Sequence, residues 1–285
     1  MRNESRFSAL PMLSSPQNAR VKEYVALRVD GNFRREKQCF LLEGRRAVAE
    51  ALGPLTLPSP LGGEGWGEGR AGVREVIFSE HILGEDLQLV AQAQAQGIAL
   101  TRVSKDVFKK IADVMTPQGI AAVVAIPRWR MEDLFANPQA LLAVACGIQD
   151  PGNLGTLVRS CEAAGAAGLV TLEDTADPFN AKVVRATAAG LLALPILRLK
   201  ADEFLSESAR RQVRLVATTA REGVPYKEFD WRTRPLALCI GSEGEGLPGK
   251  IEAACREKVT IPMKGRAESL NAAVAASILL FEAQA

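Results

Sequence analysis

Histidine is almost missing from this sequence, because His81 is the only one among 285 residues. Histidine is the side chain most often used as a general base near neutral pH, so its scarcity narrows the mechanisms open to an enzyme. The segment around it, FSEHILGED, shows no sign of a serine-histidine-aspartate site. We expect His81 on the surface, and we expect any catalysis to use other groups.

Cysteine is also scarce, and no two cysteines are spaced as CxxC. The five are Cys39, Cys146, Cys161, Cys239 and Cys255. This pattern argues against a zinc site and a disulfide framework, and it fits a reducing cytosol. The sequence also lacks a run of about 18 apolar residues and an apolar signal-peptide core near its start. We therefore expect a cytoplasmic protein without a metal site and without a membrane partner.

Net charge is low, but the charges are unevenly distributed. The formal net charge is +2, whereas residues 1–46 hold ten Lys and Arg against five Asp and Glu, a net of +5 that leaves −3 for the remainder. A basic segment on a near-neutral body is a candidate surface for nucleic acid, although a solvated basic face gives the same pattern. Charge alone leaves both interpretations open.

The first 127 residues read as a small α/β domain of short mixed elements. Strands are predicted in CFLLEG, VREVIFS, IALTRVS and GIAAVVAIP, with helical stretches between them. Residues 53–72, GPLTLPSPLGGEGWGEGRAG, interrupt this pattern, because glycine and proline dominate and no apolar period remains. We expect a flexible surface insertion there.

Residues 128–285 alternate more strictly between strands and helices. After a connector at 127–140, ALLAVACGI is a continuous apolar run, as expected for a buried parallel strand. The strands GLVTL, VRLVATT, PLALCIG and VTIPM follow, separated by helical segments, which predicts a parallel α/β sheet. In the closing helix, apolar residues at 270, 274, 278 and 281 predict the buried face.

The segment LALCIGSEGEGLPGKI, residues 236–251, contains near-matches to two phosphate-binding loops. A P-loop requires Ser or Thr after its lysine, but Ile251 stands there, and Pro248 removes a backbone donor. A dinucleotide fingerprint belongs in the first βα turn of its unit, whereas this loop comes late. Both nucleotide interpretations are therefore disfavoured.

Two other polar turns also follow predicted strands, QDPGNLGTLVRS at 149–160 and IPMKGRAESLN at 261–271. Ligands of open α/β sheets bind at the carboxyl ends of strands, so the three loops are expected to converge on one pocket. Together they resemble the three motifs of the SpoU (TrmH) family of RNA ribose 2′-O-methyltransferases. The N-terminal pieces SSPQNARVKEYVAL, FLLEGRRAVAEAL and VSKDVFKKIADVMTPQGIAAVV are similar to the family's RNA-binding domain.

The resemblance implies an α/β fold whose C-terminal methyltransferase domain, residues 128–285, is tied in a deep trefoil knot. It also implies an N-terminal RNA-binding domain over residues 1–127, S-adenosylmethionine as cofactor, and a homodimer through the knotted domain. The layout is closest to members that act on 23S ribosomal RNA. A tRNA 2′-O-methyltransferase of the same family and a non-catalytic RNA-binding relative remain open as alternatives.

The motif positions carry over the family's catalytic residues to this chain, namely Asn153, Arg159, Glu243, Ser269 and Asn271. Arginine remains protonated in proteins, so we expect Arg159 to bind RNA phosphate and stabilise developing alkoxide charge. Asn153 and Glu243 are expected to orient Arg159 and the loops. Asn153 and Ser269 are also favourable helix N-caps, a purely structural interpretation.

The same loops imply the residues that contact the cofactor. Backbone groups and side chains around the second and third motifs are expected to hold the adenine and the methionine part. These residues are Thr218, Gly241, Gly246, Ile261, Met263 and Leu270.

Overall fold

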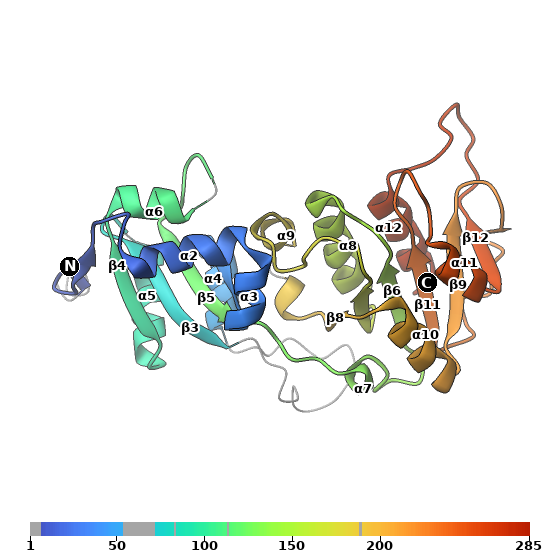
Figure 1. Cartoon of the computed structure of the whole chain (residues 1–285), viewed down its shortest axis with the longest axis horizontal. Helices are drawn as coiled ribbons and strands as arrows, with labels where there is room; N and C mark the ends of the chain where they lie inside the picture. Colours follow the sequence, from blue (N-terminus) through green and yellow to red (C-terminus); the bar gives the residue numbers. More distant parts are fainter. Residues whose placement is uncertain (1–6, 54–71, 83, 113, 188–189) are drawn as a thin grey trace. The chain divides into compact units, whose positions relative to one another are not determined.

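The computed structural model describes residues 7–53, 72–82, 84–112, 114–187 and 190–285. The predicted insertion at 53–72 lies outside these ranges except for its two terminal glycines. The chain divides into two compact units (Figure 1). Among described residues, unit 1 contains those up to 128 together with 179–192, and unit 2 contains 129–178 and 193–285.

Unit 1 is built on a mixed sheet whose five described strands lie in the order β1-β4-β3-β5-β2. The strands β1, β3 and β4 are parallel, and β5 pairs antiparallel with both β3 and β2. The strands are β1 (Met12–Leu13), β2 (Cys39–Glu43), β3 (Val73–Ser79), β4 (Ala99–Val103) and β5 (Ile120–Ala125). The helices are α2 (Ala19–Val29), α3 (Gly31–Lys37), α4 (Arg45–Leu52), α5 (Glu85–Ala95), α6 (Lys105–Ile111), α9 (Ala181–Ala186) and the 3₁₀ turn η1 (Gly190–Leu192).

A buried carboxylate joins helix α2 to this sheet. Glu75 on β3 is 8% exposed and accepts hydrogen bonds from the Tyr24 hydroxyl at 2.7 Å and from the Thr101 hydroxyl. The Arg20 guanidinium lies 2.8 Å from the same carboxylate. Burial raises the pKa of the Tyr24 phenol well above its ordinary value, so Tyr24 remains a neutral donor. The network gives α2, β3 and β4 a fixed polar contact inside an apolar core.

Unit 2 contains a fully parallel sheet whose seven described strands follow the order β10-β12-β9-β11-β6-β7-β8. The strands are β6 (Leu141–Ala145), β7 (Gly168–Thr171), β8 (Ile196–Arg198), β9 (Arg214–Thr219), β10 (Val224–Pro225), β11 (Leu236–Ile240) and β12 (Glu257–Thr260). The predicted parallel sheet is confirmed, although β12 ends before the predicted IPM. Every residue of β6, β7 and β11 is buried, which explains their continuous apolar runs.

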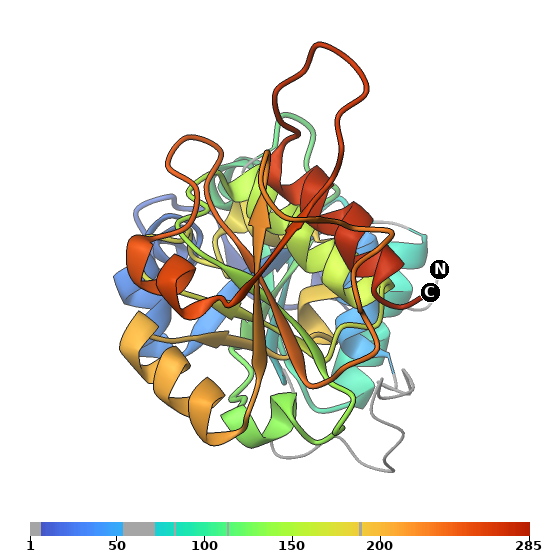
Figure 2. The ribbon, with the colours of Figure 1, turned by 90° about the vertical axis from the view of Figure 1, so that its right-hand side faces the viewer.

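Helices cover both faces of this sheet (Figure 2). They are α7 (Met131–Leu134), α8 (Pro151–Ala163), α10 (Ala201–Arg210), α11 (Gly249–Ala254) and α12 (Ala272–Glu282). The pair α8 and α12 packs together on one face, and the Ser160 and Ser277 hydroxyls are 2.6 Å apart between them. On the opposite face, Phe204 of α10 and Ile251 of α11 pack into one core with the strands.

The predicted buried face of the last helix is wrong. Val274 is 44% exposed and Phe281 is 53% exposed, whereas the buried residues of α12 include Ala273, Ala276 and Leu280. The alanines face inward because small side chains let α12 approach α8 closely. Apolar periodicity could not separate the two faces, since both faces of this helix are apolar.

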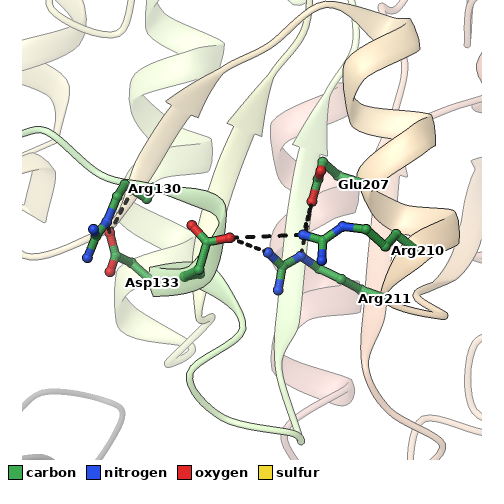
Figure 3. A network of polar contacts seen from close by, with 6 residues as sticks. Arg130, Asp133, Glu207, Arg210 and Arg211 are labelled. Carbon is green, nitrogen blue, oxygen red and sulfur yellow. Dashed lines mark hydrogen bonds and ion pairs between the residues drawn. The ribbon is translucent and has the colours of Figure 1, made fainter.

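The predicted connector at 127–140 contains one helical turn, α7, which charged groups hold against α10 within unit 2. Glu132 on α7 lies 2.6 Å from Arg211 and 4.0 Å from Arg210, and Glu207 also pairs with both arginines (Figure 3). Hydrogen bonding to Arg210 lowers the pKa of Glu207. Each exposed pair contributes little alone, but their shared geometry places α7 beside the end of α10.

His81 is exposed, as expected. Among the described residues, no helix combines the length and the apolar character needed to cross a membrane.

The Glu75 network gives a stability prediction. Glu75→Ala removes the acceptor for two buried hydroxyl groups, and we expect the local free energy of unfolding of unit 1 to fall by about 2–4 kcal/mol. Tyr24→Phe removes one donor and should cost about 1 kcal/mol. Native-state hydrogen exchange of the β3 and β4 amides measures both effects. Equal protection in Glu75→Ala and the wild type would contradict the assigned role.

Candidate functional site

The three motifs meet at the carboxyl ends of parallel strands in unit 2. The first connects β6 to α8, the second connects β11 to α11, and the third connects β12 to α12. The strands β6 and β11 are neighbours in the sheet, so the first two motifs start side by side. The third motif reaches them because α12 packs against α8.

One residue from each motif enters a shared hydrogen-bond cluster. The Glu243 Oε1 atom accepts bonds from Asn153 Nδ2 at 3.0 Å and from Asn271 Nδ2 at 2.5 Å. Asn271 Nδ2 also donates to Asn153 Oδ1 at 2.9 Å. The sequence predicted that these loops converge, and the structure brings these three side chains together. We call them the Asn-Glu-Asn cluster.

Helix capping fixes the orientation of Asn271. Its Oδ1 accepts the backbone N–H groups of Ala273 at 3.0 Å and Val274 at 3.2 Å at the start of α12. With the oxygen used in this way, the amide nitrogen must face Glu243. The carboxylate therefore lies beside the start of α12, at the positive end of a helix dipole.

The two N-cap interpretations made from the sequence are wrong. Asp150 caps α8, and its Oδ1 accepts the Asn153 N–H at 2.8 Å, so Asn153 lies within the first turn. Asn271, two residues after Ser269, caps α12. The Asn153 side chain is therefore free of capping and available to the Asn-Glu-Asn cluster.

The glycine-rich loop folds into a tight turn immediately after β11. Ser242 and Gly246 exchange two backbone hydrogen bonds of 3.1 Å each, and Gly246 adopts a φ of +70°. A Cβ at Gly241 would lie 2.2 Å from the Gly246 carbonyl carbon. Position 241 therefore requires glycine, because any side chain would open the turn. We call residues 241–247 the glycine turn.

A cavity of about 400 Å³ opens on one side of the glycine turn. All six residues predicted to contact the cofactor line it, together with Glu243 and Ser269. The Thr218 hydroxyl is itself held by the Cys239 carbonyl at 3.0 Å. Further lining residues are Thr219, Ala220, Ile240, Ser242, Gly244, Glu245, Leu247, Glu252, Ala272, Ala275 and Leu279. We call it the first cavity.

The composition of the first cavity favours an uncharged or cationic ligand over a phosphate. Its described lining includes Glu243, Glu245 and Glu252 but neither lysine nor arginine. Lys250, the residue that would serve a P-loop, instead forms an ion pair with Asp202. Apolar walls, backbone groups and carboxylates suit an adenosine carrying a sulfonium and an ammonium group. The residues present therefore fit S-adenosylmethionine.

A second cavity of about 700 Å³ lies on the other side of the glycine turn. It is lined by the loops that follow β6, β7 and β11, and it includes Asn153 and Glu243. Residues 242–247 and Ala272 line both cavities. The Asn-Glu-Asn cluster is therefore placed where the two spaces adjoin.

Three of the predicted catalytic residues differ in where they lie relative to the two cavities and the Asn-Glu-Asn cluster. Ser269 is exposed and lines the first cavity. Asn271 belongs to the cluster but is not among the described lining of either cavity. Arg159 is exposed on α8, two turns beyond Asn153, and is likewise absent from both linings. Their catalytic roles stay predictions.

Sequence reasoning did not include several cavity residues that a simple rule identifies. Thr219 and Ala220 follow β9, and Glu173 and Asp174 follow β7, at the same edge of the sheet as the motifs. The rule that ligands bind at carboxyl ends of parallel strands covers these positions. Ala275 and Leu279 offered no comparable signal, because their inclusion depends on how α12 packs.

Comparison with known protein families shows which family the chain belongs to. Residues 140–281 match the model described as the SpoU rRNA Methylase family, and residues 65–130 match RNA 2′-O ribose methyltransferase substrate binding. A 23S rRNA (guanosine(2553)-2′-O)-methyltransferase, RlmP of Bacillus subtilis, is 32% identical over 95% of this chain and 98% of its own length. The chain belongs to the SpoU rRNA methylase family.

Solved structures of family members are similar over almost the whole chain. An AdoMet-bound rRNA methyltransferase from Sinorhizobium meliloti is 30% identical, with a TM-score of 0.79 over 96% of this chain and 97% of that chain. AviRb from Streptomyces viridochromogenes, solved in complex with AdoMet, is 27% identical with a TM-score of 0.77, covering 94% and 98%. Both agree with the cofactor that the first cavity fits.

The close contact at Gly241 gives a binding prediction. Gly241→Ala forces the glycine turn open, and we expect the affinity for S-adenosylmethionine to fall by on the order of 100-fold. Gly244→Ala is the matched control in the same loop, because a Cβ there meets no atom within 4 Å. Isothermal titration calorimetry measures the affinity of both variants for S-adenosylmethionine. Unchanged affinity in Gly241→Ala would contradict the role given to the turn.

Proposed function

We propose that this protein transfers a methyl group from S-adenosylmethionine to a ribose 2′-hydroxyl of 23S ribosomal RNA. The observation that carries the proposal is the Asn-Glu-Asn cluster, which joins the three family motifs between two cavities. RlmP of B. subtilis and RlmB of Xylella fastidiosa, both named as 23S rRNA guanosine 2′-O-methyltransferases, support the substrate class.

The residues of the first cavity would hold the cofactor. Its sulfonium would supply a methyl group that is already activated toward displacement, with S-adenosylhomocysteine as the leaving group and release of the 2′-hydroxyl proton. Backbone groups of the glycine turn and of Ile261 and Leu270 would bind the adenine and the methionine part, while Glu243 and Glu245 offset positive charge. Thr218 and Met263 complete the walls. Fixed placement of the reacting groups contributes several kcal/mol to such a displacement.

The remaining motif residues would act on the RNA. Arg159 provides a fixed cation that binds phosphate and stabilises negative charge developing on the 2′-oxygen. Ser269 would contact the substrate at the mouth of the first cavity. Glu243, held by two asparagine amides, keeps the first and third motif loops in register during the reaction.

The architecture proposed with this function has two domains and two copies of the chain. Residues 1–127 would bind RNA, and residues 128–285 would form the methyltransferase domain, with its C-terminal segment threaded as a trefoil knot. The strand order, in which β12 joins the far side of β9 while α12 returns to α8, supports the knot. A ribosomal RNA substrate supports a cytoplasmic location.

A homodimer would explain two features of α8 and α12. Val274 and Phe281 are exposed apolar residues on α12, and Arg159 is exposed on α8 outside the described lining of both cavities of its own chain. An interface formed by these helices would bury the apolar surface. It would also allow Arg159 to complete the site of the second copy.

Arg159→Ala tests the proposed reaction. We expect kcat for methylation of ribosomal RNA to fall by about 10²-fold or more, because one preorganised charge is lost, while the affinity for S-adenosylmethionine stays unchanged. Transfer of tritiated methyl to RNA from cells lacking the gene measures the rate. Arg256→Ala, at another exposed arginine of unit 2, is the control. Activity of Arg159→Ala equal to that of the control would refute this role.

Phe281→Glu tests the dimer. The wild-type chain of 30.6 kDa should sediment at twice this mass. Phe281→Glu should sediment as a monomer and methylate RNA more slowly, because dimerisation would bury the introduced charge in an apolar interface. Val224→Glu is the control, since Val224 is 44% exposed and lies outside α8 and α12. A monomeric wild-type protein, or a dimeric Phe281→Glu variant, would rule out this interface.

A further inference from the structure

Of the six residues predicted to contact the cofactor, only Gly246 is in the described lining of the second cavity, which adjoins the Asn-Glu-Asn cluster. Its walls are the loops after β6, β7 and β11, and it shares the glycine turn with the first cavity. A group bound here lies beside Asn153 and Glu243 and is separated from the first cavity only by that turn. This is the space in which the nucleotide that carries the reacting ribose can be received.

The described lining of the second cavity is acidic. It contains Asp150, Glu173, Asp174, Glu243 and Glu245 but no lysine, arginine or histidine. Such a lining repels a phosphate and favours a neutral group that presents hydrogen-bond donors. A nucleobase is the part of a nucleotide that meets this description, whereas its phosphates belong outside the cavity.

Only part of this carboxylate set is available to a ligand. Asp150 caps α8, Glu173 accepts the Ala201 N–H at 2.8 Å, and Glu243 is bonded to two asparagines. The carboxylates of Asp174 and Glu245 have no hydrogen bond or ion pair to another described residue, although the Glu245 backbone N–H donates to the Ser242 hydroxyl at 3.2 Å. Glu245 lines both cavities, whereas Asp174 lines the second alone.

The backbone around Asp174 is held in place. Asp174 has a φ of +64°, and the adjacent Thr175 is 4% exposed. The Thr175 hydroxyl donates to the Ala145 carbonyl at 3.0 Å and accepts the Gly147 N–H at 3.1 Å, which ties this turn to the loop after β6. A short side chain on a fixed backbone presents its carboxylate in a narrow range of positions.

The chemistry of the four RNA bases then decides which one fits. Guanine presents two adjacent donors, N1–H and N2–H, and one carboxylate can accept both. Adenine and cytosine each place a ring acceptor beside their amino group, and uracil flanks its single N–H with two carbonyls. An unpartnered carboxylate therefore favours guanine and opposes the other three bases.

We propose that the second cavity receives the base of the target nucleotide and that Asp174 selects guanine by accepting its N1–H and N2–H. The inference rests on the proposed methyl transfer and adds the residue of this chain that selects the base. It makes Asp174 a specificity residue, separate from the cofactor site and from the Asn-Glu-Asn cluster.

The test compares bases at the methylated position. Ribosomal RNA from cells lacking the gene is methylated with the full-length protein and the 2′-O-methyl position is mapped, which should give a guanosine. RNA fragments spanning that position are then prepared with guanosine or with inosine, which lacks the N2 amine. We expect the wild type to prefer guanosine by about 10-fold or more in kcat/KM.

Asp174→Asn separates recognition from structure. Asparagine also tolerates a positive φ, so the turn is retained, but one of the two acceptor oxygens becomes an amide nitrogen that faces a guanine donor. We expect kcat/KM on guanosine RNA to fall by about 10- to 100-fold, the preference over inosine to disappear, and the affinity for S-adenosylmethionine to stay unchanged. Glu228→Gln, an exposed acid of unit 2 outside the described lining of both cavities, controls for loss of charge.

The outcomes of these experiments distinguish the assignment of the base from the proposed methyl transfer on which it rests. A wild-type protein that methylates no RNA would overturn both. Methylation of a nucleotide other than guanosine, or equal losses on guanosine and inosine RNA in Asp174→Asn, would overturn the base assignment and leave the proposed methyl transfer intact.

Discussion

The Glu243 carboxylate joins loops that start at three different strands. Asn153 binds it from the loop after β6 and Asn271 from the loop after β12, while Glu243 itself follows β11. Each of these hydrogen bonds is exposed and contributes modest free energy. Their importance is geometric, because a single oxygen atom accepts both amides and thereby fixes the spacing of α8, α12 and the glycine turn. Loss of either amide would release one loop from the other two.

Sheet order explains why a single turn can serve two cavities. Strand β11 lies between β9 and β6, so the loop that follows it has neighbouring loops on both sides. On the β9 side the described residues form the first cavity, and on the β6 side they form the second. The close approach at Gly241 keeps the turn thin enough to separate the two spaces without filling either. Cofactor and substrate can then meet beside the Asn-Glu-Asn cluster.

The local sequence predicted those elements whose apolar pattern does not depend on how other elements pack against them. The strand VREVIFS matches β3 at both ends, and the apolar runs of β6, β7 and β11 correspond to buried parallel strands. The convergence of the motifs followed from the rule for carboxyl ends of strands. The buried face of α12 and the capping residues could not be predicted, because both depend on how the helices pack. Asn153 is a good cap by itself, but Asp150 begins the helix three residues earlier.

Glycine spacing alone also misrepresents what a loop binds. Glycines report that backbone segments approach closely, and at Gly241 that approach is to the chain's own Gly246. The identity of a ligand depends on charge and on donors, and the charged side chains in the described lining of both cavities are all acids. The one lysine that completes the phosphate-loop pattern, Lys250, pairs with Asp202 on another helix. A loop with this shape and these charges excludes polyphosphates and accepts a cationic adenosine derivative on one side, with a donor-bearing base on the other.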